Sequence, residues 1–359
     1  MKKKTRLQFV SFLLTAALIF TLAGCGAVPA EEAPAEDADT AGETVVSEDG
    51  DTASDFEDFV AEAYLEEEDA ALISISEEEM VPLTESGAAV SADLMPVASG
   101  TVVYTGGGAT IDASNTAEGY IMVKYGGTST ARLKVMVTGP SGTNYTYNLN
   151  TQGNYETFPL SDGNGTYKLG VYQNVSGNRY SVLLSKSVSV SLENEFAPFL
   201  RPNQYVNYAT AGNTVAKAAE LCQGKTTELE KVEAVYHFVV KNFTYDKEKA
   251  ASVQSGYLPD VDAVLAARKG ICFDYAAVMA AMLRSQGVPT KLVVGYTGSV
   301  YHAWINCYSA DSGWIDGVIF FDGSTWKLMD PTFASSANSS AKIMEYIGTG
   351  SNYTAKYLY

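Results

Sequence analysis

Residues able to carry covalent catalysis are scarce in this chain of 359 residues, which has four cysteines and two histidines. Cys272 stands near the start of the alanine-rich segment GICFDYAAVMAAMLRSQGVP, residues 270–289. A helix beginning at Cys272 presents free backbone N–H groups and the positive end of its dipole to the sulfur, and both stabilise a thiolate. Gly270 allows a sharp turn into that helix, and the alanines allow close packing on a sheet. Cys272 is therefore either a small buried residue or a nucleophile.

A cysteine nucleophile needs a base, and the base needs a group that orients it. His302 lies in the alternating run YHAWINC, which predicts a strand with His302 and Trp304 on one face and Cys307 on the other. Cys307 is thus expected in the core. Asp330 ends a short predicted strand before Pro331. It can accept the Nδ1–H of His302 and leave Nε2 facing the thiolate, or it can serve only as a turn cap.

The second histidine, His237, is expected at the surface. Thr227 and Glu230 have the spacing of a capping box, and from Val232 onward apolar residues recur at helical intervals. His237 falls on the flank of that apolar stripe. It is therefore a weaker candidate for the base than His302.

Residues 195–359 place helices before strands. Asn213 or Thr214 is expected to cap a helix through about Cys222, and another helix is expected over 261–268. After the cysteine helix come four strand-like runs: TKLVVGYT, VYHAWINCYS, GVIFFD and TWKLMD. This order predicts an α+β domain.

Residues 98–192 have a different pattern, with short runs of alternating polarity separated by Gly, Asn, Asp and Ser. About six to eight strands of this length predict an all-β sandwich of the immunoglobulin-like kind. No cluster of titratable residues that could do chemistry occurs there. A spacer or a binding module is the expected role.

The N-terminus predicts export. A basic cluster in residues 2–6 precedes an apolar stretch of roughly 15 residues, which is typical of a secretory signal and short for a membrane span. The ending LAGC resembles the bacterial lipobox, which implies cleavage after residue 24 and lipidation of Cys25. Residues 1–24 are thus read as a lipoprotein signal peptide. The mature protein is expected outside the cytoplasm, anchored to the membrane.

Residues 25–97 are expected to be a disordered acidic tether. Residues 31–80 contain 20 of the 42 acidic residues and no Lys or Arg, which leaves 22 acids and 20 of the 24 bases for residues 81–359. The folded part is therefore almost neutral. The acids lack the spacing and glycine of a calcium loop, so no metal is expected. No basic stripe with aromatic residues is present, which argues against nucleic-acid binding.

The motifs together resemble the transglutaminase-like superfamily, which has a papain-like catalytic domain. They are GxCxDYA, GVP, KLVVGY, HAW and WKLMDPTF, in that order over residues 195 to about 345. Matching residue by residue, the resemblance implies that Cys272 is the nucleophile, His302 the base and Asp330 the orienting acid, with no cofactor. The pair Tyr245 and Asp246 also looks like the family's usual pair.

Two departures from the family pattern leave the shape of the cleft open. Ile305 and Asn306 follow HAW where many members have Asn-Glu, and a longer insert precedes Trp326. The resemblance implies thiol-dependent acyl transfer on peptide amides, with the backbone N–H of Cys272 and a less favoured second donor, Tyr245, at the oxyanion.

Three functions are compatible with these residues. A cysteine peptidase or amidase is the first expectation, acting on a protein or peptide, with cell-wall peptides among the candidates. A cross-linking transglutaminase would use the same triad with a lysine amine in place of water. A non-catalytic cell-surface binding module is the third, and the complete set of Cys272, His302 and Asp330 argues against it. The oligomeric state is left open.

Overall fold

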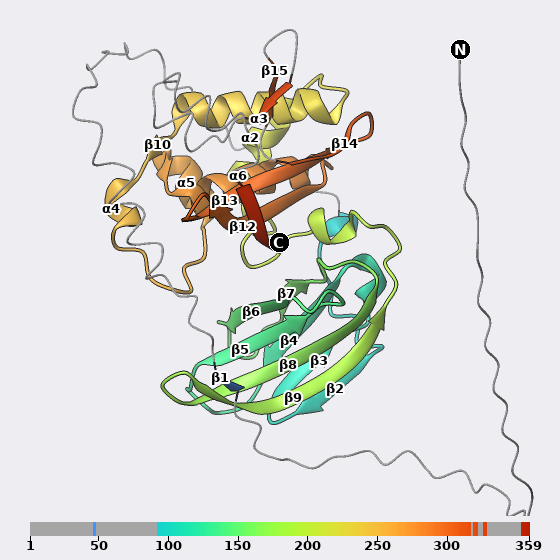
Figure 1. Ribbon diagram of the computed structural model, residues 1–359. Helices are drawn as coiled ribbons and strands as arrows, with labels where there is room; N and C mark the ends of the chain where they lie inside the picture. The colour runs from blue at the N-terminus through green and yellow to red at the C-terminus, as the bar shows by residue number, and fades with distance from the viewer. Residues whose placement is uncertain (1–45, 48–91, 317–318, 322–325, 329–352) are drawn as a thin grey trace, which may run out of the picture. The chain divides into compact units, whose positions relative to one another are not determined.

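The structure is a computed structural model that describes residues 46–47, 92–316, 319–321, 326–328 and 353–359 (Figure 1). Cys25, Asp330 and nearly all of the predicted tether lie outside the described residues. The architecture is mixed α/β, with strands dominating residues 98–192 and helices followed by strands from residue 212 onward.

Two antiparallel sheets make up the strand-rich part. The first has the order β2-β3-β4-β7, and the second has the order β1-β9-β8-β5-β6. The strands are β1 (Val46–Ser47), β2 (Val103–Gly106), β3 (Ala109–Asp112), β4 (Tyr120–Tyr125), β5 (Leu133–Thr138), β6 (Asn144–Leu149), β7 (Glu156–Pro159), β8 (Gly165–Ser176) and β9 (Arg179–Val190). Short 3-10 turns η1 (Ala92–Leu94), η2 (Thr116–Glu118) and η3 (Ala197–Phe199) flank them.

Alternation along β8 builds the interior of this part. Tyr167, Leu169 and Val171 share one face, as their spacing predicts, and all three are fully buried. The Tyr167 hydroxyl donates to the carbonyl of Gly163 and accepts from the N–H of Asp162, both at 2.9 Å. The buried tyrosine thus keeps its polar end satisfied at the turn before the strand. The immunoglobulin-like relationship and the boundary at residues 192–195 stay predictions.

The second part contains the helices α2 (Gly212–Cys222), α3 (Glu228–Asn242), α4 (Lys247–Ala250), α5 (Val261–Ala267) and α6 (Cys272–Ser285). Its main sheet has the order β14-β13-β12-β17, with β12 (Thr290–Thr297), β13 (Val300–Ser309), β14 (Gly313–Ile315) and β17 (Tyr353–Leu358). Two short pairs complete it: β10 (Thr244–Tyr245) with β11 (Lys269–Gly270), and β15 (Ile319–Phe321) with β16 (Trp326–Leu328).

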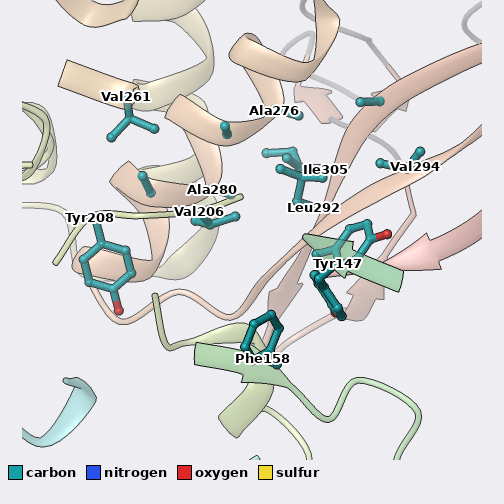
Figure 2. Packing of buried hydrophobic residues seen from close by; sticks show 14 of the residues in the cluster. Tyr147, Phe158, Val206, Tyr208, Val261, Ala276, Ala280, Leu292, Val294 and Ile305 are labelled. Carbon is teal, nitrogen blue, oxygen red and sulfur yellow. The ribbon is translucent and has the colours of Figure 1, made fainter. Parts of the chain in front are cut away.

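Helix α6 is the centre of this part. It packs against β12 and β13 on one side and contacts α2, α3 and α5. All of its residues except Phe273 and Ser285 are buried. Figure 2 shows Ala276 and Ala280 of the helix near Leu292 and Ile305 of the sheet. The small alanine side chains permit this close approach of helix and sheet, as the sequence predicts.

The start of α2 corrects the expectation that Asn213 or Thr214 caps the helix with its own side chain. The carboxylate of Asp262, from the first turn of α5, accepts the N–H groups of Asn213 and Thr214 at 3.2 and 2.8 Å, and the Thr214 hydroxyl at 2.6 Å. An acid from another helix therefore satisfies the free amides that a local cap would otherwise bind. The capping box of Thr227 and Glu230 on α3 is confirmed.

A buried arginine, Arg284, lies at the C-terminal end of α6. The Arg284 guanidinium is fully buried and donates to the carbonyls of Thr290 and Arg201 at 2.8 Å each, and to the main-chain oxygen of Tyr359. Burial lowers the pKa of Arg284 to about 10. Arg201 and Tyr359, both distant in sequence, thus meet the nearby Thr290 at one side chain at the end of α6.

Candidate active site

Cys272 is the first residue of α6, as predicted, and is 2% exposed. The residues that open a helix have N–H groups without intrahelical acceptors, and these groups carry the positive end of the helix dipole. Cys272 therefore stands at the end of α6 that carries the free N–H groups. Of the cysteines that the structure describes, Cys222, Cys272 and Cys307 are all free thiols.

The turn into α6 is built by a short parallel ladder. Thr244 and Tyr245 of β10 pair with Lys269 and Gly270 of β11, and the N–H of Asp246 donates to the Gly270 carbonyl at 2.9 Å. The two residues of the Tyr-Asp motif are thereby held beside the segment that leads to the cysteine. Tyr245 lies on the strand that pairs with this turn.

Gly270 serves close packing. Its φ is not positive; the left-handed conformation falls instead on Arg268, with φ 49°. A Cβ on Gly270 would come within 2.6 Å of the Cβ of Asp274, so a larger residue would displace the first turn of α6. The backbone therefore turns at Arg268 and not at Gly270. Gly270 is instead required because its backbone lies against the side chain of Asp274.

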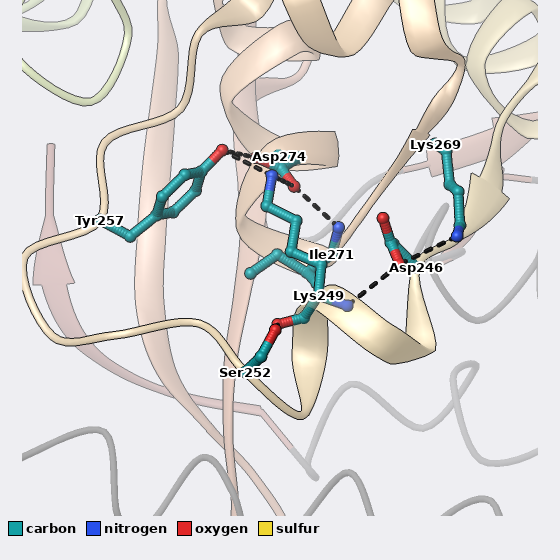
Figure 3. Close-up of polar contacts among 7 residues, drawn as sticks. All are labelled: Asp246, Lys249, Ser252, Tyr257, Lys269, Ile271 and Asp274. Atoms are coloured by element: carbon teal, nitrogen blue, oxygen red, sulfur yellow. Dashed lines mark hydrogen bonds and ion pairs between the residues drawn. The ribbon is translucent and has the colours of Figure 1, made fainter.

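Asp274 in the first turn of α6 is fully buried, and Figure 3 shows its polar contacts. Its Oδ2 accepts the N–H of Ile271 at 2.9 Å and pairs with Lys249 Nζ at 2.6 Å. Its Oδ1 accepts the hydroxyl of Tyr257 at 2.6 Å. Asp274 belongs to the GxCxDYA motif, but no role was predicted for it from the sequence. The sequence does contain a sign of this role: Asp274 stands three residues after Ile271, the N-cap of α6, which is the position of the acid in a capping box.

His302 lies on β13 and is 2% exposed. Its ring stacks on Trp304 at 6.2 Å between centroids and lies 6.4 Å from the ring of Tyr353 on β17. In the ladder with β12, His302 is the partner of Gly295. The core around α6 contains Cys307, which alternation sets on the face opposite to His302, as predicted.

Cys272 and His302 come from elements in contact, because α6 packs against β13. Tyr301, which precedes His302 on β13, lies within electrostatic reach of Cys272. Burial raises the pKa of the Tyr301 hydroxyl, and nearby Tyr357, Tyr205 and Cys272 add to the effect when they are charged. The start of β13 therefore approaches the start of α6 through Tyr301, whose side chain projects from the strand face opposite to that of His302. Asp330, the third member of the predicted triad, lies outside the described residues.

The second histidine lies at the surface, and the other two described cysteines lie in the core. The side chain of His237 is 52% exposed and lies 3.8 Å from Glu233 one turn earlier, so its expected surface position is confirmed. Burial raises the pKa of Cys307 to about 12 and also raises that of Cys222. Both thiols are core residues that stay protonated at neutral pH.

The residues that the structure describes contain no group of three or more His, Cys, Asp or Glu side chains arranged to hold a metal ion. Within the same residues, no helix has the length and apolar composition needed to cross a membrane.

Comparison with known proteins finds a family similarity in the region from α2 to β14. Residues 215–317 match the family model of the transglutaminase-like superfamily, which confirms the resemblance seen in the motifs. The matched region contains Cys272 and His302. Over 118 residues the chain is 30% identical to the uncharacterized protein YebA of Bacillus subtilis, covering 27% of this chain and 16% of YebA. The chain thus spans less than a fifth of that relative.

Solved structures give looser similarities. A candidate cysteine protease from Cytophaga hutchinsonii is 15% identical, with 72% of this chain and 78% of that chain covered and a TM-score of 0.34. Red sea bream transglutaminase is 12% identical, with 62% and 54% covered and a TM-score of 0.25. Such low TM-scores carry no conclusion about function. The family match over residues 215–317 supports a thiol-dependent enzyme in general terms.

Proposed function

We propose that the transglutaminase-like domain matched at residues 215–317 performs thiol-dependent acyl transfer on peptide amides, with hydrolysis as its reaction. The position of Cys272 at the start of the buried helix α6 carries this proposal. A thiol there has the free amides and dipole that favour the thiolate, which is the nucleophilic form. His302, on the strand that packs against α6, is the proposed base, and Asp330 is the proposed orienting acid.

The proposed reaction has two steps, acylation of Cys272 and hydrolysis of the resulting thioester. The Cys272 thiolate forms a bond to the amide carbonyl carbon, and the C–N bond breaks as protonated His302 gives its proton to the leaving amine. The backbone N–H of Cys272 stabilises the developing oxyanion, with Tyr245 as the second candidate donor. His302 then takes a proton from water, whose oxygen attacks the thioester carbon and releases the acid and the thiolate.

The test is a reaction panel read by mass spectrometry. The full-length chain is incubated with peptides, with and without primary amines, beside Cys272→Ala as the matched control. We expect cleaved peptides, whose two fragments together contain one added water, or deamidated side chains, which gain water and lose ammonia, only in the presence of the cysteine. Amine adducts in place of water products would replace hydrolysis with transamidation. No product of either kind across the panel would favour a binding module.

We also propose that the protein acts outside the cytoplasm as a lipoprotein anchored through Cys25. The basic cluster, apolar stretch and LAGC ending support this localisation. In this arrangement residues 98–192 form an immunoglobulin-like spacer or recognition module between the acidic tether and the catalytic domain. Cys25→Ala is expected to release the protein from the membrane fraction. Unchanged retention with an unmodified N-terminal peptide would refute the anchor and leave the catalytic proposal untouched.

A further inference from the structure

A buried ion pair lies in the first turn of the helix that begins with the proposed nucleophile. The side chain of Asp274, two residues after Cys272, is fully buried, and Lys249 Nζ is 2.6 Å from its Oδ2. A buried carboxylate is retained as a charge only when it is paired and hydrogen-bonded. Lys249 comes from α4, twenty-five residues earlier in the chain. The pair therefore joins a distant segment to the first turn of the cysteine helix.

The carboxylate would be harmful to a thiolate if it stood alone. A like charge near an acidic group disfavours the ionised form of that group, and the effect is strong where water is excluded. An unpaired Asp274 would thus oppose the stabilisation that the start of α6 gives to the Cys272 sulfur. A cation at 2.6 Å cancels most of that field while leaving Asp274 able to accept the N–H of Ile271.

We propose that Lys249 is a positioning residue for Cys272: its ammonium neutralises the carboxylate of Asp274 and holds residues 246–257 against the first turn of α6. This inference rests on the proposed role of Cys272 as the nucleophile. Neither Lys249 nor Tyr257 belongs to a motif recognised in the sequence.

The segment 246–257 has the contacts that such a role requires (Figure 3). Asp246 caps α4 by accepting the N–H of Lys249 at 3.0 Å and pairs with Lys269 of β11 at 3.1 Å. Lys249 Nζ also lies 2.6 Å from the Tyr257 hydroxyl and 4.3 Å from the centre of its ring. The Lys249 ammonium thus joins α4 and Tyr257 to Asp274.

Tyr257 also contacts Phe273, the residue that directly follows Cys272. The ring of Tyr257 meets the ring of Phe273 edge-on at 6.5 Å between centroids. Displacement of Tyr257 would therefore change the packing of the residue that directly follows Cys272.

Other titratable groups lie on α6, on the elements that contact it and around Tyr301, and the test has to hold them constant. They come from the helix itself, from the ladder before it, from β13 and β17, and from the segment before α2: Tyr275, Tyr245, Asp246, Arg268, Lys269, Tyr301, His302, Tyr357 and Tyr205. Each variant below changes only Lys249, Asp274 or an exposed control, so any difference between variants belongs to the pair.

The experiment measures the rate of iodoacetamide alkylation of Cys272 in the full-length chain from pH 5 to 10, read on the Cys272 peptide by mass spectrometry. For Lys249→Met we expect the midpoint of the pH profile to rise by about one pH unit, and the rate at pH 7 to fall roughly tenfold. Asp274→Asn should lower the midpoint, because the cation is then left without its anion. The double variant should return close to the wild-type midpoint, since the two charges are removed together.

Two further variants separate charge from bulk. Lys249→Arg keeps the charge and should retain a midpoint near wild type. Lys247→Met, at an exposed position on the same helix, should leave the profile unchanged. A wild-type midpoint in folded Lys249→Met would overturn the inference. If Lys249→Met does not fold, an unchanged or raised midpoint in Asp274→Asn would overturn it instead.

The readout also distinguishes this inference from the proposed function. A Cys272 that resists alkylation in the wild-type chain at every pH tested would contradict its role as nucleophile. A reactive Cys272 whose profile ignores Lys249 would contradict only the role of the ion pair.

Discussion

Gly295 and His302 are direct partners in the ladder between β12 and β13, and Gly295 also marks an irregularity in the pairing of β12 with β17. A Cβ at Gly295 would come within 2.9 Å of the Trp304 ring and 3.0 Å of the Ala355 Cα, and closer still to the Thr354 carbonyl. The absence of a side chain at Gly295 therefore lets β17 approach β12 opposite the proposed base.

Gly295→Ala is expected to lower the free energy of unfolding by about 1–3 kcal/mol, because backbone atoms of β17 would have to move to accommodate the methyl group. Urea denaturation measures the change. Gly126→Ala is the matched control, since the nearest atom to an added Cβ there is 4.0 Å away and its φ is not positive. Equal stability of Gly295→Ala and wild type would contradict the close contact.

The two histidines should differ sharply in their effect on turnover. His302→Ala is expected to lower it by roughly 10³-fold or more, comparably to Cys272→Ala, if the triad acts as a unit. His237→Ala should change turnover by less than about threefold, because that side chain is exposed beside Glu233. Asp330→Asn should fall between these values, since the base would remain present but poorly oriented.

Turnover for these variants is measured on whichever peptide the reaction panel identifies, with thermal unfolding as a check on folding. A folded His302→Ala variant with near-normal turnover would refute the mechanism and favour the binding module.

The three described cysteines should label differently in the native protein. Cys272 is expected to react with iodoacetamide at neutral pH. Cys307 should not, because burial raises its pKa to about 12 and keeps it protonated at every pH below that value. Cys222, whose pKa burial also raises, should likewise need denaturant. Peptide mass spectrometry before and after unfolding gives the labelling of each thiol, and equal native labelling of all three would count against these assignments.

Arg284→Met should cost about 3 kcal/mol or more of unfolding free energy. The substitution keeps much of the side-chain volume but leaves the carbonyls of Thr290, Arg201 and Tyr359 without their buried donor. Arg179→Met, at an exposed position on β9, is the matched control and should change stability by less than about 0.5 kcal/mol. Chemical denaturation of both variants checks the difference, and a similar loss in the two would argue against the role of Arg284.

Local sequence patterns predicted the elements around the site well. The capping box of α3, the start of α6 at Cys272 and the alternation of β13 all depend on residues one to four positions apart, whose relative directions are set by helix or strand geometry alone. For the same reason the surface position of His237 and the core position of Cys307 could be read from their neighbours.

Tertiary structure decided the contacts between residues far apart in the chain. Asp262 replaces a local cap on α2, and Lys249 and Tyr257 bind Asp274. Arg284 binds the carbonyls of Arg201 and Tyr359, which are both distant in sequence. A single sequence contains no local sign of such pairs, because chain folding, and not residue spacing, brings their partners together. Sequence by itself thus determined which helix carries the candidate nucleophile, and the tertiary contacts decided which charges surround it and how that helix is held.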